Sequence, residues 1–149
     1  MLSLKSGRLL VVCVGNICRS PVAAEMLRQK LPAWQINSAG LAGLSGHDIE
    51  SMAREIAAEN GLICPVHQGA RLTEKDCLEH DLILVMESQH MQAVHRLQPQ
   101  ARGRVFLLGE PLGGQEISDP YGQSREFFQH THQLMLDSVD AWVPILNRG

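Results

Sequence analysis

The stretch Val11–Pro21, "VVCVGNICRSP", decides how the chain begins to fold. The apolar run from Leu9 to Val14 is typical of a buried strand. Ser20-Pro21 is typical of a helix start, with serine as the N-cap and proline at the first helical position. Between them lie cysteine, asparagine and arginine residues, which a purely structural turn does not need. These residues therefore indicate a functional loop between a strand and a helix.

Apolar runs and helix-period segments alternate along the rest of the chain. Strands are expected at Leu9–Val14, Trp34–Asn37, Leu82–Met86 and Val105–Leu108. Helices are expected from Ser20 to about Lys30, from Asp48 to Asn60, after the caps Thr73 and Ser88, and from about Ser124 to Val143, where Pro144 ends or kinks the last one. The alternation predicts βαβ units around a parallel sheet, in one α/β domain that spans residues 1–149, with Trp34 and Trp142 in the core.

The composition argues against several classes of protein. The net charge is −3 and the arginines and lysines are scattered, so we expect no nucleic-acid partner. No apolar run approaches the roughly 18 residues of a membrane span, so we expect no membrane insertion. Four cysteines without an evident export signal favour free thiols and a cytoplasmic location. The spacing of the cysteines and histidines fits no zinc site, so no metal is expected.

The loop after the first strand has the residue types of an anion site. Its backbone N–H groups point toward a helix N-terminus, where the helix dipole favours an anion. Gly15 and Asn16 tolerate left-handed backbone, which gathers successive N–H groups around one concavity. The planar guanidinium of Arg19 can bind two phosphoryl oxygens, and the same positive surroundings favour the thiolate of Cys13. The loop is therefore expected to hold phosphate above a nucleophilic sulfur, to which Ser20 can donate a hydrogen bond.

The segment from Cys13 to Ser20, "CVGNICRS", resembles the phosphate loop of the low-molecular-weight protein tyrosine phosphatases. The likeness extends from Leu9 to Asn147 and includes "SAG" from Ser38, His67, "DLILVME" from Asp81 and "DPYG" from Asp119. The chain is most similar to the bacterial branch that accompanies tyrosine autokinases of capsule and exopolysaccharide export. The resemblance implies a flavodoxin-like three-layer sandwich, with a four-stranded parallel sheet flanked by helices. It also implies hydrolysis of phosphotyrosine to inorganic phosphate, with no metal and no organic cofactor.

The resemblance assigns roles to the catalytic residues. Cys13 corresponds to the nucleophile, Arg19 to the phosphate clamp and Asp119 to the general acid. The role of Asp119 is chemically reasonable because a phenolate leaving group needs a proton, and Pro120 stiffens the loop, although an Asp-Pro pair alone is typical of a turn. The phosphate loop comprises Val14, Gly15, Asn16, Ile17, Cys18, Arg19 and Ser20. The side chains that support it are Asn16, Ser20, Ser38 and His67.

The resemblance also implies a substrate cleft and a redox function. The residues expected to line the cleft are Ile17, Leu41, Leu44 and Tyr121. An aromatic wall of this kind contacts the flat ring of phosphotyrosine better than the short side chain of phosphoserine. Cys18 corresponds to a thiol that can form a reversible disulfide with Cys13 and protect it from overoxidation, although a small buried side chain would also explain a cysteine there.

Two positions depart from the family pattern. Ala70 stands where the family usually has arginine, and Arg71 follows one position later. Ile49 stands in place of a usual proline after Asp48. Neither position belongs to the expected chemistry, but both bear on the support of the loop around His67.

Three other functions remain as alternatives. Thiol-dependent arsenate reductases share a Cys-x5-Arg loop, but they need further redox cysteines in a late segment, where this chain offers only Cys77. Phosphoarginine phosphatases carry a smaller, polar residue at the place of Ile17. A non-catalytic phosphate-binding module would use the loop without chemistry, but it gains nothing from a carboxylate such as Asp119 near phosphate.

Overall fold

Four parallel strands form the centre of the molecule in the computed structural model, which describes residues 6–42 and 46–147. The strands are β1 (Gly7–Cys13), β2 (Trp34–Gly40), β3 (Leu82–Val85) and β4 (Val105–Leu107). Their order is β2-β1-β3-β4, and every neighbouring pair is parallel. The expected parallel sheet is confirmed, and β2 continues three residues beyond its expected end at Asn37 because it pairs with β1 as far as Cys13 and Gly40.

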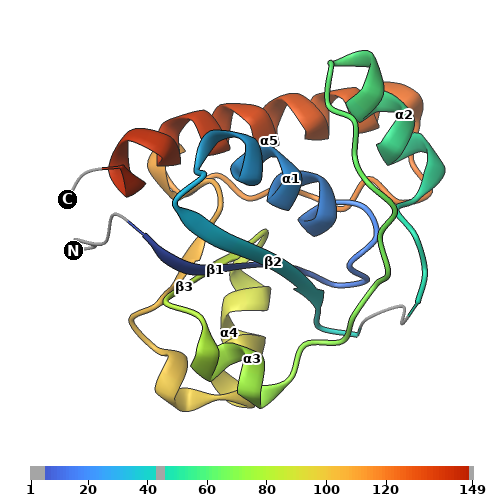
Figure 1. The fold of residues 1–149 in the computed structure, drawn as a ribbon. Coiled ribbons are helices and arrows are strands. Elements are labelled where there is room, and N and C mark those ends of the chain that lie inside the picture. Colours follow the sequence, from blue (N-terminus) through green and yellow to red (C-terminus); the bar gives the residue numbers. More distant parts are fainter. Residues whose placement is uncertain (1–5, 43–45, 148–149) are drawn as a thin grey trace.

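Helices cover both faces of the sheet. They are α1 (Ser20–Lys30), α2 (Ser51–Glu59), α3 (Glu74–Glu79), α4 (Ser88–Leu97) and α5 (Arg125–Leu146), with short 3-10 turns η1 (Pro99–Ala101) and η2 (Glu110–Leu112). Figure 1 shows α1, α2 and α5 over one face and α3 and α4 over the other. This arrangement confirms the expected three-layer, flavodoxin-like sandwich.

Successive residues of β1 fill two separate hydrophobic cores. Leu9 and Val11 belong to the core under α1, α2 and α5, whereas Leu10 and Val12 belong to the core on the face of α3 and α4. This alternation is the period of two that a strand imposes. The two tryptophans, Trp34 and Trp142, are both buried in the first core, as expected.

Two helix starts differ from the expectation because side chains near them have other partners. Arg19, and not Ser20, is the N-cap of α1, and the hydroxyl of Ser20 lies instead 2.9 Å from the sulfur of Cys13. Glu50, and not Asp48, caps α2 by accepting hydrogen bonds from two backbone N–H groups of its first turn. Asp48 instead accepts the N–H of His67, at 2.9 Å.

Three further helix ends test the sequence pattern. Thr73 caps α3 as expected, by accepting the N–H of Asp76 at 3.1 Å. The cap of α4 is Glu87, one residue before the expected Ser88. Pro144 does not end α5, which continues to Leu146. Pro144 removes one backbone hydrogen bond of the helix. Leu146, in the turn that continues beyond the proline, is completely buried.

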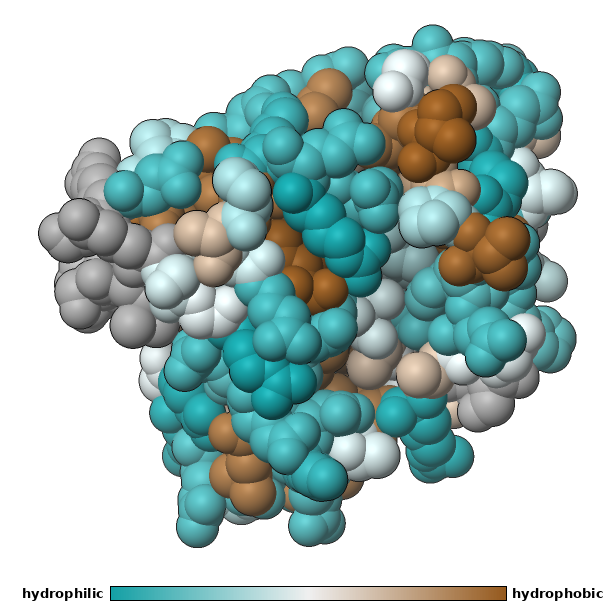
Figure 2. All heavy atoms as spheres, in the orientation of Figure 1, coloured by the Kyte–Doolittle hydropathy of each residue, from teal (hydrophilic) through white to brown (hydrophobic). Residues whose placement is uncertain are grey.

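The surface is mainly hydrophilic on the face drawn in Figure 2, with separate hydrophobic groups near α2 and the segment that follows it. In that segment Ile63 and Val66 are 72% and 86% exposed. Over the part of the chain that the structure describes, no helix is both long and apolar enough to cross a lipid bilayer.

Candidate active site

The loop between β1 and α1 lies at the carboxyl end of the sheet, between the ends of β1 and β3. The strand order reverses at this point, because the chain moves outward from β1 to β2 and then returns to β3 on the other side. Such a switch point leaves a crevice in which α/β proteins bind ligands. A cavity of about 250 Å³ opens here, and its lining residues are Cys13, Val14, Gly15, Ile17, Cys18, Arg19, Ala42, Asp119 and Tyr121.

The sulfur of Cys13 lies among hydrogen-bond donors. The N–H of Asn16 points to it at 3.3 Å, and the hydroxyl of Ser20 lies 2.9 Å away. Ser20 already accepts a hydrogen bond from the side-chain amide of Asn16 at 2.7 Å, so its own proton is free to point at the sulfur. Donors on both sides stabilise negative charge on sulfur, and this is what a thiolate nucleophile requires.

Asn16 organises the loop from its centre. Its φ of 59° is left-handed, as expected, whereas Gly15 has no positive φ, so the expectation for Gly15 is wrong. The Asn16 side chain donates to Ser38 at 3.0 Å and accepts the N–H of Ala70 at 3.0 Å. The backbone carbonyl of Asn16 accepts the ring N–H of His67 at 2.8 Å. These hydrogen bonds hold Asn16 in its left-handed backbone conformation, and asparagine is a residue type that tolerates this conformation.

Arg19 is a buried cation with one free edge. Its Nη1 donates to Glu87 Oε2 at 2.7 Å and to the carbonyl of Ile117 at 2.8 Å. Its Nη2 lies 3.9 Å from Asp119 Oδ2, and its Nε has no hydrogen-bond partner among the described residues. The Nε and Nη2 groups form the side of the guanidinium fork that can bind two oxygens of one phosphoryl group. A buried unpaired donor is costly, and a bound oxyanion would remove that cost.

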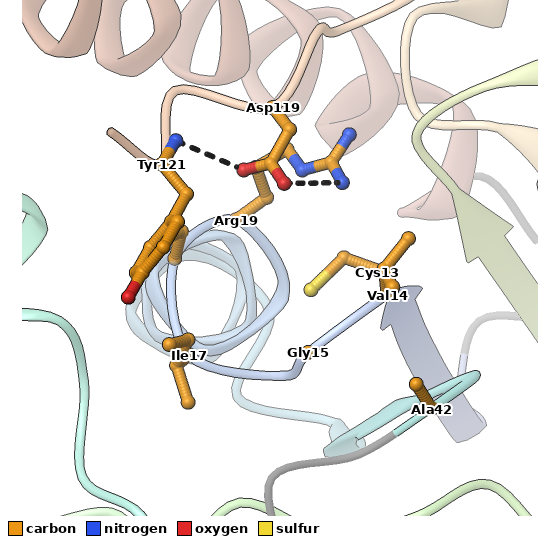
Figure 3. A pocket seen from close by; sticks show the side chains of 9 residues that line it. Cys13, Val14, Gly15, Ile17, Arg19, Ala42, Asp119 and Tyr121 are labelled. Carbon is orange, nitrogen blue, oxygen red and sulfur yellow. Dashed lines mark hydrogen bonds and ion pairs between the residues drawn. The ribbon is translucent and has the colours of Figure 1, made fainter. Parts of the chain in front are cut away.

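The late loop, residues 113–124 between η2 and α5, carries Asp119 to the cavity. Ile117 anchors this loop because its N–H donates to the carbonyl of Met86 at 2.9 Å while its own carbonyl accepts from Arg19. Two residues further on, the carboxylate of Asp119 accepts the N–H of Tyr121 at 3.1 Å, which fixes its direction. Figure 3 shows Asp119, Arg19 and Cys13 around the same space. A thiol, a guanidinium and a carboxyl group therefore converge on one space from two parts of the chain, the loop after β1 and the loop that carries Asp119.

The cleft walls agree only partly with the expectation. Ile17 and the exposed ring of Tyr121 line the cavity, on one side of it in Figure 3. Leu41 does not line it: this side chain packs against the core on the face of α3 and α4. Ala42, which sequence reasoning missed, takes the place in the lining. Leu44 lies outside the described residues.

Cys18 shares the cavity with Cys13 but has a different electrostatic environment. It is almost completely buried, and all four cysteines of the chain are free thiols, as expected. Burial, followed by the negative charges of Asp119 and Glu50, raises the pKa of Cys18 to about 12. Cys18 therefore remains a protonated thiol at neutral pH. Its assignment as a protective redox partner of Cys13 stays a prediction.

The two departures from the family pattern are accommodated by the backbone. Ala70 supports the loop through its N–H, which donates to Asn16, and through its carbonyl, which accepts from Gly40 at 2.8 Å. Neither contact needs a side chain at position 70. Ile49 is buried in the core, and its N–H donates to the Asp48 carboxylate at 2.7 Å, a hydrogen bond that proline could not make.

Gly40 ends β2 directly against the phosphate loop. A Cβ atom there would lie 2.5 Å from the carbonyl oxygen of Val14 and 2.9 Å from the backbone nitrogen of Asn16. The Gly40→Ala variant must therefore displace the loop. We expect kcat/KM for an aryl phosphate to fall about 100-fold, because a misplacement of about 1 Å has an effect of this size. Steady-state kinetics measure the change in kcat/KM, and inhibition by inorganic phosphate measures the change in phosphate affinity.

Gly61→Ala is the matched control for this prediction. Gly61 follows α2 with a φ of 81°, and the space around it is open. Alanine there is strained by about 1 kcal/mol, so the free energy of unfolding falls while kcat/KM does not change. Unaltered kinetics in Gly40→Ala would show that the loop tolerates the extra methyl group, contrary to the prediction.

The fold and the site together define a phosphate-handling α/β protein with a cysteine in its anion-binding loop, and the comparisons with known proteins agree. Residues 8–149 match the family described as "Low molecular weight phosphotyrosine protein phosphatase". The low-molecular-weight protein-tyrosine-phosphatase Etp of Escherichia coli K12 is 39% identical over 148 residues, which cover 99% of this chain and 100% of that protein. The chain belongs to the low-molecular-weight phosphotyrosine protein phosphatase family.

Solved structures show the same fold. Wzb of Vibrio vulnificus in complex with benzylphosphonate superposes with a TM-score of 0.91 and is 43% identical, covering 93% of this chain and 98% of that one. The tyrosine phosphatase Wzb of Escherichia coli K30 in complex with sulphate also gives a TM-score of 0.91, at 40% identity, covering 93% of this chain and 97% of that one. Both of those structures contain oxyanion groups, a phosphonate in the first and sulphate in the second.

Proposed function

We propose that this protein hydrolyses phosphotyrosine in proteins through a phosphocysteine intermediate. The observation that carries the proposal is the convergence of three groups on one cavity: the sulfur of Cys13, the free edge of Arg19 and the carboxyl of Asp119. A nucleophile, an oxyanion clamp and a proton donor are the three parts that a double displacement at phosphorus requires.

In the first step, the Cys13 sulfur attacks phosphorus, and a P–S bond forms as the P–O bond to the phenol breaks. Asp119 gives its proton to the phenol oxygen, so the leaving group departs neutral. In the second step, Asp119 takes a proton from water, whose oxygen attacks phosphorus and breaks the P–S bond. Inorganic phosphate leaves, and the Cys13 thiolate is restored. The loop N–H groups and Arg19 hold the phosphoryl oxygens throughout both steps.

The walls of the cavity support selectivity for an aromatic substrate. Ile17 of the phosphate loop and Tyr121 present apolar surface to the cavity, where a phosphotyrosine ring would stack or pack edge-on. We propose that the physiological partner is a bacterial tyrosine autokinase of capsule or exopolysaccharide export and that both proteins meet in the cytoplasm. The names of the related phosphatases support a phosphotyrosine protein as the partner, and the resemblance of this chain to the capsule and exopolysaccharide branch favours an autokinase. Four free thiols support a cytoplasmic location, because a reducing compartment preserves them.

One panel of substrates tests the proposed function. Hydrolysis is followed for a phosphorylated tyrosine autokinase and for phosphotyrosine, phosphoserine and phosphoarginine peptides, with EDTA present. We expect turnover of the phosphotyrosine substrates at least about 100-fold above the others, because a pocket that fits the ring discriminates at the transition state. Rapid turnover of phosphoarginine would overturn the assignment of substrate. Absence of turnover by the reduced enzyme would favour arsenate reduction, assayed with thioredoxin, or phosphate binding alone.

A further inference from the structure

His90, in the first turn of α4, has a buried hydrogen-bond donor without a partner. The side chain is 2% exposed, and its Nδ1 accepts the N–H of Glu87 at 3.2 Å. In the neutral ring the proton must therefore be on Nε2. This Nε2 has no hydrogen-bond partner among the described residues and lies 3.6 Å from Glu87 Oε2, which is longer than a hydrogen bond. Such an orphan donor in a native structure calls for an explanation.

The ring is held in its neutral form. Burial, followed by the charge of Arg19, lowers the pKa of His90, although the carboxylates of Glu87, Glu116 and Asp119 act in the opposite direction. At neutral pH the ring therefore carries one proton. Because Nδ1 accepts the backbone N–H of Glu87, that proton is on Nε2. The donor is available in the state in which the enzyme works.

The carboxylate oxygen near this donor is the one that holds Arg19. Glu87 Oε2 accepts from Arg19 Nη1 at 2.7 Å. A dianionic phosphoryl group bound to the free edge of Arg19 would interact with the same guanidinium charge as Glu87 and would repel the Glu87 carboxylate. The hydrogen bond between Arg19 Nη1 and Glu87 would therefore weaken. A second donor to Glu87 Oε2 would offset this loss, and the Nε2–H of His90 needs to move only a short distance to supply it.

We propose that His90 is a positioning residue whose Nε2–H closes onto Glu87 when a phosphoryl oxyanion binds, so that Glu87 keeps Arg19 aligned. The inference rests on the proposed function, because it assumes that the cavity takes a phosphoryl oxyanion. It differs from a helix-capping role, which would use only the Nδ1 acceptor of the ring.

Two substitutions separate these roles. His90→Gln places an amide donor near the position of Nε2, whereas His90→Asn keeps an acceptor near the position of Nδ1 and loses the donor. We expect His90→Asn to weaken inhibition by inorganic phosphate and to lower kcat/KM for an aryl phosphate, each about five-fold, the effect of one hydrogen bond to a charged group. His90→Gln should stay within about two-fold of the wild type, the margin left by an imperfect isostere. Thermal unfolding is the control that checks whether both variants are folded.

Nitrogen-15 NMR of the wild-type ring supplies a readout that a capping role would not affect. On saturation with inorganic phosphate, we expect the Nε2–H proton of His90 to shift downfield and its exchange with water to slow. The proposal would be overturned if the Nε2–H resonance of His90 did not change on saturation with phosphate. It would also be overturned if His90→Asn kept wild-type phosphate inhibition and kcat/KM while His90→Gln lost them. Phosphate affinity and NMR do not require turnover, so a failure of the proposed phosphatase activity would be seen separately, in the substrate panel.

Discussion

Cys13→Ser is expected to abolish turnover of phosphotyrosine, with kcat lowered by about 10⁴-fold or more, as for loss of the nucleophile in other covalent enzymes. A serine hydroxyl must lose its proton to attack phosphorus, and among the described residues no carboxylate or imidazole is hydrogen-bonded to the side chain at position 13. The groups nearest to the Cys13 sulfur are the N–H of Asn16 and the hydroxyl of Ser20, which both donate. Such donors stabilise negative charge on sulfur, but they are not bases that could generate an alkoxide.

Binding and chemistry can be separated in this variant. The Arg19 edge and the loop N–H groups do not depend on the sulfur, so Cys13→Ser should still bind inorganic phosphate with nearly wild-type affinity in calorimetry. Rapid quenching of the wild type with phosphotyrosine should yield a protein that carries one phosphoryl group on Cys13, and the variant should yield none.

Cys77→Ser is the matched control, because Cys77 is buried in α3, on the other face of the sheet from α1. Its new hydroxyl can donate to the carbonyl of Thr73 one helical turn earlier, so the fold is kept. The control should retain wild-type kcat. Appreciable turnover by Cys13→Ser, or loss of activity in both variants alike, would contradict a nucleophilic role that is specific to Cys13.

The parts of the fold that follow from neighbouring residues could be predicted from the sequence. β1, the loop and α1 are encoded by a continuous apolar run followed by Ser20-Pro21, and the structure forms them within one or two residues of the expected bounds. Ser20 shows where propensity fails. Its residue type favours an N-cap, but its hydroxyl is used at the Cys13 sulfur, so the requirement of the site overrides the local preference.

The parts of the site that depend on distant contacts could not be predicted in the same way. Arg19 binds Glu87 and Ile117, which are 68 and 98 residues away in sequence. Nothing in the neighbourhood of Ile117 indicates that its carbonyl is used. Glu87 did carry a signal, because it follows the buried strand β3, whose carboxyl end lies beside that of β1. The place of Leu41 in the cleft was expected from the resemblance alone, whereas its side chain packs against the core on the face of α3 and α4 and Ala42 lines the cavity.

Arg19 connects the two halves of the site. It holds the late loop through the carbonyl of Ile117, and it faces Asp119, two residues further along, through Nη2. A phosphoryl group on Arg19 therefore lies at a distance from Asp119 that the protein itself sets. This coupling supports the proposed role of Asp119 as general acid, since its loop is anchored by the residue that is proposed to hold the phosphoryl group.

Asp119→Ala is expected to lower kcat for phosphotyrosine by about 10²- to 10⁴-fold, the usual contribution of a general acid. The phenol of tyrosine has a pKa of about 10, so its anion is a poor leaving group without a proton. The loss should be much smaller for para-nitrophenyl phosphate, whose phenolate leaves readily. Comparison of the two substrates under single-turnover conditions measures the difference, because formation of the phosphocysteine is then observed alone.

The dependence on the leaving group distinguishes acid catalysis from a loss of structure. A disturbed loop would slow both substrates by the same factor, whereas a missing proton donor slows the poorer leaving group more. Asp137→Asn is the matched control, because Asp137 is exposed on α5 and its one side-chain hydrogen bond among the described residues is to Gln133. It should leave both rates unchanged. Equal losses for the two substrates in Asp119→Ala would show that Asp119 holds the late loop in place and that another group, or water, protonates the phenol.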